Sequence, residues 1–248
     1  MLRILLRADD LGYSEGVNHG LAWACDNGLP MSIGLMMNLP AVRHGYELIA
    51  GRNHCLGMHA TISAGRPLSA PQDVPSLVDQ NGSFLPSDLY RKATEDRVAL
   101  EDVEREAEAQ YQAFVEMVGT EPEYVDVHAV SSKNFVAGVR RVAARHTKPF
   151  SFLSGDGDIM RVGTSDVLLH ASQGELTRLL ADVAASNEQM AAPVTHILML
   201  HPGYVDGQLI RTSSLTIGRT ADADLLRSAE LRAFATRPDV ELVTYRDL

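Results

Sequence analysis

The sequence predicts an α/β protein, in which strands and helices alternate from one end of the chain to the other. Two observations lead to this prediction. Short apolar runs of strand length recur along the chain, and segments with helical periodicity separate them. Such alternation predicts a largely parallel sheet, either a closed barrel or an open, doubly wound sheet. The 248 residues show no linker and no change in composition, so we expect one domain over residues 1–248.

The first half of the chain is predicted to supply four strands. They cover residues 2–8, 31–37, 55–62 and 124–128. Helices are expected at residues 15–27, 41–50 and 87–118, because glycines follow the first and third and a proline precedes the second. The segment between the third strand and the third helix is rich in proline and has no clear period, which is typical of a lid or binding loop.

Four more strands are predicted in the second half of the chain. They cover residues 150–153, 167–170, 194–200 and 240–244, with helices at residues 134–146, 175–187 and 221–235. The strand at 194–200 is strongly apolar and runs directly into His201, which a Pro-Gly turn follows.

Polar residues at the strand ends favour a barrel over an open sheet. Asp9 and Asp10 follow the first strand, His59 lies near the end of the third, and His128 and His201 end the fourth and seventh. The carboxyl ends of barrel strands surround one mouth, where such residues can meet, whereas an open sheet spreads them along an edge. We therefore predict a distorted, TIM-barrel-like (β/α) barrel.

Composition and charge restrict the partners. The net charge of -10 disfavours non-specific binding to nucleic acid or to an anionic membrane, since both require a cationic surface. No apolar stretch approaches the length of about 20 residues that a membrane span needs, and the N-terminus lacks the features of a signal peptide. We therefore expect a cytoplasmic protein that binds neither nucleic acid nor a membrane.

The adjacent acids Asp9 and Asp10 allow two interpretations. Two carboxylates at a strand end repel each other, and a bound cation relieves this repulsion, with one carboxylate as its ligand and the other as a base. Alternatively, Asp10 caps the following helix and Asp9 is solvated. His59, in an otherwise apolar strand, would by itself be read as a hydrogen-bonded core histidine. Asp126 could orient His128 or simply be polar.

Taken together, the strand-end residues are more informative. One carboxylate and two histidines on different strands form a plausible site for a divalent ion with open positions, which polarises a carbonyl and activates water. His201 could protonate a leaving amine, or it could only hold the turn that follows it.

These motifs resemble the YdjC-like carbohydrate deacetylase family, which includes the chitooligosaccharide deacetylases. The resemblance covers nearly the whole chain in matching order. It is carried by residues 7–14 (RADDLGYS), 16–20 (GVNHG), 57–59 (GMH), 126–128 (DVH), 201–204 (HPGY) and 227–231 (RSAEL).

The resemblance implies a metal-dependent hydrolase that removes N-acetyl groups from amino sugars, such as chitooligosaccharides, with or without phosphate. It implies magnesium or zinc held by Asp10, His59 and His128, with Asp9 as general base and His201 as general acid or oxyanion partner. A homodimer is common for such barrels. Two alternatives stay open: a metal hydrolase of another amide or of a phosphate ester, and a sugar-binding relative without catalysis.

Overall fold

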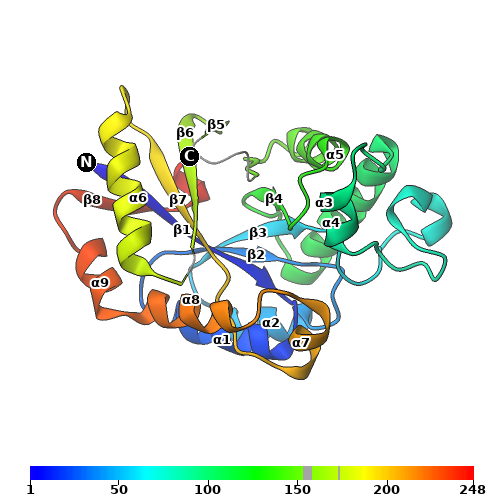
Figure 1. Cartoon of the computed structure of the whole chain (residues 1–248), viewed down its shortest axis with the longest axis horizontal. Helices are drawn as coiled ribbons and strands as arrows, with labels where there is room; N and C mark the ends of the chain where they lie inside the picture. Colours follow the sequence, from blue (N-terminus) through cyan, green and yellow to red (C-terminus); the bar gives the residue numbers. More distant parts are fainter. Residues whose placement is uncertain (153–157, 173) are drawn as a thin grey trace.

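A curled, mainly parallel sheet lies at the centre of the computed structural model, which describes residues 1–152, 158–172 and 174–248 (Figure 1). Its strands are β1 (Leu2–Leu11), β2 (Ser32–Leu35), β3 (Cys55–Ala60), β4 (Val125–Val127), β5 (Ile159–Val162), β6 (Ser165–Ala171), β7 (Thr195–Leu200) and β8 (Val240–Val243). Their order is β4-β3-β2-β1-β7-β6-β5, and β8 pairs with β1 off this path. Only the β5–β6 pair is antiparallel among these pairings.

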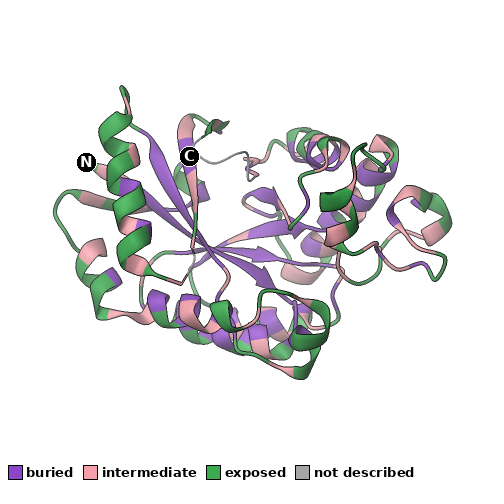
Figure 2. Cartoon of the chain, viewed as in Figure 1, coloured by how far each residue is buried: buried purple, intermediate pink, exposed green. Residues whose placement is uncertain are grey.

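Helices cover the outside of the sheet. They are α1 (Glu15–Cys25), α2 (Val42–Ile49), α3 (Ser87–Lys92), α4 (Leu100–Val118), α5 (Lys133–Arg145), α6 (Leu176–Gln189), α7 (Gly207–Thr212), α8 (Ile217–Arg227) and α9 (Ala229–Ala235). Three short 3-10 helices, η1 (Pro71–Asp73), η2 (Pro75–Leu77) and η3 (Tyr245–Asp247), complete the described elements. Figure 2 shows buried strands inside and helices with exposed outer faces, the pattern expected when helices pack on a sheet core. None of the described helices is both long and apolar enough to span a bilayer.

The first strand changes partners along its length. Its beginning lies between β8 and β7, with Arg3 paired to Glu241 on one side and to Thr195 on the other. Its end lies between β2 and β7, and it is buried from Ile4 onwards. The carboxyl end of β1 is therefore at the centre of the molecule.

The predicted α/β class is confirmed, and the barrel is distorted. Among the described residues, the edge strands β4 and β5 do not pair with each other, so the sheet is a curled half-barrel rather than a closed cylinder. The hairpin of β5 and β6 turns back antiparallel at one edge, which interrupts the parallel pattern that closure requires.

Several predicted boundaries are wrong. The strand predicted at residues 150–153 is only a bridge from Phe150 to Val125, and residue 153 lies outside the described part of the chain. Strand β5 and helix α7 were not predicted. The helix expected over 87–118 is two helices, because Asp96 accepts hydrogen bonds from Ser132 and Asn134 and so ties the intervening segment to α5. The helix expected over 221–235 begins earlier and is divided at Ser228, which caps α9.

Candidate active site

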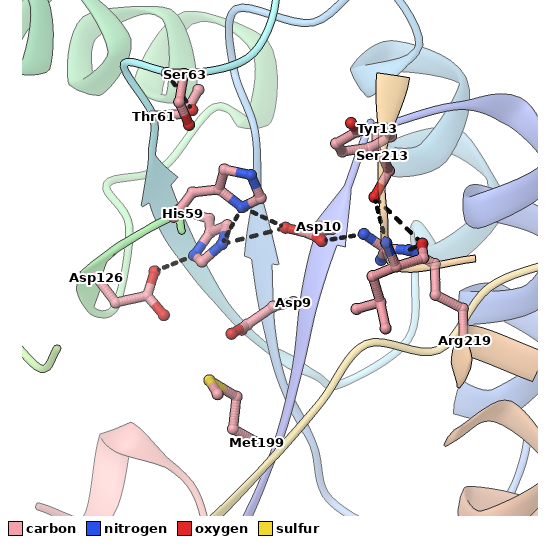
Figure 3. A network of polar contacts seen from close by, with 12 residues as sticks. Asp9, Asp10, Tyr13, His59, Thr61, Ser63, Asp126, Met199, Ser213 and Arg219 are labelled. Atoms are coloured by element: carbon pink, nitrogen blue, oxygen red, sulfur yellow. Dashed lines mark hydrogen bonds and ion pairs between the residues drawn. The ribbon is translucent and has the colours of Figure 1, made fainter. Parts of the chain in front are cut away.

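An irregularity in β1 brings the two adjacent carboxylates together. Between Ala8 and Leu11 the register with β2 slips, so that three residue steps on β1 face two on β2. This is a bulge, and Asp10 accommodates it with a φ of 77°, in the left-handed region that non-glycine residues rarely adopt. A regular strand would direct Asp9 and Asp10 to opposite faces. Here both side chains approach His59 (Figure 3).

The structure contradicts the alternative interpretation of this pair. Both carboxylates are fully buried, so Asp9 is not a solvated loop residue. Ser14, rather than Asp10, caps α1, because its hydroxyl oxygen accepts the N–H of Val17 at 3.2 Å. Burying two carboxylates is unfavourable unless each has a partner. Because Asp9 is not solvated and Asp10 is not a helix cap, the pair must have other partners.

Asp10, His59 and His128 converge at the carboxyl ends of β1, β3 and β4. Asp10 Oδ1 lies 3.2 Å from His59 Nε2 and 2.9 Å from His128 Nδ1. The two imidazole nitrogens are 3.2 Å apart. Three strands that are separate in the sequence thus present one oxygen and two nitrogens to the same point.

Asp126 orients His59 rather than His128. Its Oδ1 lies 2.7 Å from His59 Nδ1, which leaves Nε2 of the ring facing Asp10. Burial alone would lower the pKa of His59, but Asp126 and Asp9 raise it well above its ordinary value. A carboxylate that fixes the second ring nitrogen of a histidine is the usual support of a metal-binding imidazole.

Each of the paired carboxylates is bound by its own buried arginine. Arg7 Nη2 donates to Asp9 Oδ2 at 2.8 Å, and Arg219 Nη2 donates to Asp10 Oδ2 at 2.6 Å. Although burial raises the pKa of Asp10, His128 and Arg219 hold it well below its usual range. Asp10 is therefore ionised. Arg7 Nη1 also lies 3.2 Å from Asp126 Oδ2, so this arginine contacts both Asp9 and Asp126.

Asp9 keeps one oxygen without a partner. Within the described residues, no hydrogen bond reaches its buried Oδ1. The space around this atom depends on Gly34 of β2, because a Cβ at that position would lie 3.3 Å from Asp9 Oδ1 and 3.0 Å from His59 Cβ. A carboxylate oxygen with a free lone pair can accept a proton.

His201 joins the site through a cavity of about 350 Å³. The cavity wall includes Asp10, His128, His201 and Arg219, together with Tyr13 and residues of the loop that follows α7. Burial lowers the pKa of His201, so its ring is neutral near pH 7. The cavity gives a small molecule access to Asp10 and His128, behind which His59 is buried.

The donor atoms of this site suit a divalent metal ion. Ligands that share one ion at about 2.0–2.2 Å lie about 3 Å from one another, and the three donors show this spacing. Asp10 Oδ1 is buried and has no well-aligned hydrogen bond in the described part of the chain, so its lone pairs are available. Three protein ligands leave further positions for water and substrate.

All five residues singled out from the sequence lie in this region, and two important ones were missed. Arg7 alternates with Asp9 on the same strand, and an arginine in a buried strand was a usable signal. Arg219 gave no signal, because it lies 209 residues from Asp10 in the sequence and on an ordinary amphipathic helix.

Comparison with known proteins agrees with this architecture. A family model described as YdjC-like protein matches residues 3–237. A carbohydrate deacetylase from Geobacillus stearothermophilus is 32% identical over 98% of this chain and 96% of its own length. A chitooligosaccharide deacetylase from Klebsiella pneumoniae subsp. pneumoniae is 31% identical, with 99% of this chain and 98% of that protein covered.

Solved structures share the fold. A crystal structure of a protein from Enterococcus faecalis V583 matches with a TM-score of 0.82 at 21% identity, covering 99% of this chain and 98% of that one. A CE4 esterase from Streptococcus mutans matches with a TM-score of 0.55 at 11% identity, covering 98% of this chain and 85% of that one. The match to the family model and the similarity to curated relatives along the whole chain confirm the resemblance seen in the motifs, and the chain belongs to the YdjC-like protein family.

Proposed function

We propose that this protein is a metal-dependent hydrolase that removes the N-acetyl group from amino sugars related to chitooligosaccharides. The observation that carries the proposal is the convergence of Asp10, His59 and His128 beside a cavity that His201 also lines. The names of the relatives, carbohydrate deacetylase and chitooligosaccharide deacetylase, support the substrate class.

Asp10, His59 and His128 would hold the metal ion. When bound there, a divalent ion would polarise the amide carbonyl and make water more acidic. Two imidazole nitrogens and one carboxylate oxygen favour zinc or a similar transition metal over magnesium, which prefers a shell of oxygen ligands. Asp126 supports this set by fixing the Nδ1 side of His59.

Asp9 is suited to act as general base. Arg7 holds its Oδ2, so the carboxylate cannot rotate freely, while Oδ1 is left to accept a proton from the attacking water. The water oxygen bonds to the acetyl carbon as this proton moves to Asp9.

His201 is suited to act as the general acid that protonates the leaving amine. As a neutral ring it has one N–H to donate to the carbonyl oxygen as negative charge develops there. That charge favours uptake of a second proton by the ring from water in the cavity. This proton would pass to the nitrogen as the C–N bond breaks, and Asp9 would release to water the proton that it accepted. Acetate and a free amino sugar are the products, and the proton taken from water balances the one given to the amine.

The test is acetate release from a panel of N-acetylated sugars of different length, with and without phosphate. The protein is stripped with a chelator and reloaded with Zn²⁺ or Mg²⁺. We expect Zn²⁺-dependent release of acetate and no release of phosphate. Phosphate release would identify the hydrolase of a phosphate ester. Tight sugar binding without turnover under any metal would identify a non-catalytic relative.

A further inference from the structure

We propose that the first two turns of α8 position the active site from outside the barrel mouth: Arg219 determines which oxygen of Asp10 faces the metal site, and Asp222 determines where His201 lies. This inference rests on the proposed function, because it concerns how the same site is held. Neither residue was among the candidates from the sequence.

Arg219 is held so firmly that it fixes Asp10. The side chain is 1% exposed, and its Nε donates to the carbonyl oxygen of Leu215 at 3.0 Å while its Nη2 binds Asp10 Oδ2 at 2.6 Å. The guanidinium carbon also lies 5.2 Å from the centre of the Tyr13 ring. With Oδ2 occupied in this way, only Oδ1 of Asp10 is directed at His59 and His128, as Figure 3 shows for Asp10, His59 and Arg219. Asp10 is thereby restricted to one ligand oxygen.

Asp222 lies one helical turn later and holds the end of β7. Its Oδ2 accepts the backbone N–H of His201 at 2.7 Å, and its Oδ1 accepts the hydroxyl of Ser172 at 2.5 Å. The N–H of Gly203, in the turn after His201, donates to the carbonyl oxygen of Arg219 at 3.1 Å. Asp222 itself is 4% exposed. A short stretch of α8 therefore bonds to the ends of β1, β6 and β7.

These contacts predict two separable effects. A change at Arg219 frees the carboxylate of Asp10, so it should weaken metal binding. A change at Asp222 frees the backbone that carries His201, so it should slow the proton transfer and leave metal binding intact. A role limited to packing would not separate the two effects.

The experiment compares Arg219→Lys and Asp222→Asn with matched controls in the full-length protein. Arg232→Lys, on the exposed side of α9, and Asp224→Asn, on the exposed side of α8, make the same chemical changes away from the site. Zn²⁺ affinity is measured by calorimetry on metal-free protein, kcat and KM by acetate release at saturating Zn²⁺, and folding by thermal unfolding.

For Arg219→Lys we expect Zn²⁺ affinity to fall by about 10–100-fold, because the charge remains but the two-point hold is lost. For Asp222→Asn we expect kcat to fall by about 10–100-fold, with KM and Zn²⁺ affinity within about twofold of the wild type. Asp222→Ala, which removes both acceptors, should lower kcat further. Controls should match the wild type.

The proposal is overturned if both variants alter the same quantity, or if neither differs from its control. If no substrate is turned over, the proposed function fails, but Zn²⁺ affinity still tests Arg219. Asp222 is then tested by NMR of the His201 ring, identified by its loss in His201→Gln. A shifted His201 signal with an unchanged His59 signal supports the role of Asp222, and an unchanged His201 signal refutes it.

Discussion

The different roles proposed for Asp9 and Asp10 depend on two arginines, one bound to each carboxylate. Arg7 and Arg219 each bind the Oδ2 of one carboxylate, and each leaves Oδ1 for another task. Buried charges of this kind are tolerated only when paired, and removing one partner of a buried pair typically costs about 3–5 kcal/mol. Replacing either arginine should therefore destabilise the fold as well as disturb the site. Replacing the other site residues should have different effects on turnover and metal binding.

Asp9→Asn should lower turnover by at least about 10²-fold, because the amide cannot take the proton from water. The metal content should stay near that of the wild type, since Asp9 is not one of the three converging donors. Turnover of acetate and metal analysis of the same sample check both statements. Loss of metal with ordinary turnover per bound ion would show that the roles of Asp9 and Asp10 are reversed.

Asp126→Asn should weaken metal binding by about 10–100-fold, because the ring of His59 loses the charged acceptor at Nδ1. Calorimetric titration of the metal-free variant measures the effect. Asp166→Asn is the matched control, since Asp166 also lies in a strand but is half-exposed and pairs only with Arg161 in the described structure. Equal affinity in the two variants would refute the orienting role.

At the scale of elements, the site depends on how β1 and β2 fit together. The bulge between Ala8 and Leu11 supplies the direction of Asp9 and Asp10, and Gly34 on β2 leaves room for Asp9 Oδ1 and His59. Two neighbouring strands thus contribute backbone geometry, and not only side chains, to the reactive centre.

Gly34→Ala should reduce turnover by about tenfold or more while the protein still folds, because the new methyl group would press on His59 and Asp9 within the site. Its expected cost in stability is about 1–3 kcal/mol, as for other overpacked positions. Gly207→Ala, where a Cβ would meet only the mobile end of Arg211, is the control. Turnover and urea unfolding separate the two effects, and wild-type turnover in Gly34→Ala would contradict the close fit.

The sequence predicts which strands carry the site residues, but it does not predict the local backbone geometry of these strands. Apolar runs ending in Asp9, His59, His128 and His201 identify the strands and their common edge, because side-chain pattern and strand position are local properties. The bulge is different, since it arises from a mismatch of one residue between β1 and β2, and neither strand shows this alone. Arg219 was missed for a related reason, because its role depends on how α8 packs at the barrel mouth.

At the scale of the whole molecule, stability should depend on pH through a buried histidine pair. His196 on β7 is fully buried, and its Nδ1 lies 2.9 Å from His170 Nε2 on β6. Burial, with a smaller contribution from His170, lowers the pKa of His196 from 6.5 to about 4. Between these two pKa values, His196 binds a proton in the unfolded chain but not in the folded protein. The free energy of unfolding therefore decreases as the pH falls from 6.5 towards 4.

His196→Gln should remove about 1 kcal/mol of the stability loss between pH 7.5 and pH 5, after allowance for water near the pair. The free energy of unfolding in urea at the two pH values measures this. His19→Gln, at an exposed histidine of α1, should leave the loss as in the wild type. If His196→Gln and the wild type lose the same free energy of unfolding between the two pH values, the His170–His196 pair is not the source of the pH dependence.

The way β1 changes partners has a consequence for synthesis on the ribosome. Strand β1 has β7 along one side and β8 beside its beginning, and both of these strands are made long after β1. Arg219 is made more than two hundred residues after Asp9 and Asp10. A nascent chain that has not reached α8 therefore carries the Asp10 carboxylate without its arginine. A product that ends before α8 therefore lacks the contact that holds Asp10, and we expect it to bind the proposed metal ion more weakly than the whole chain.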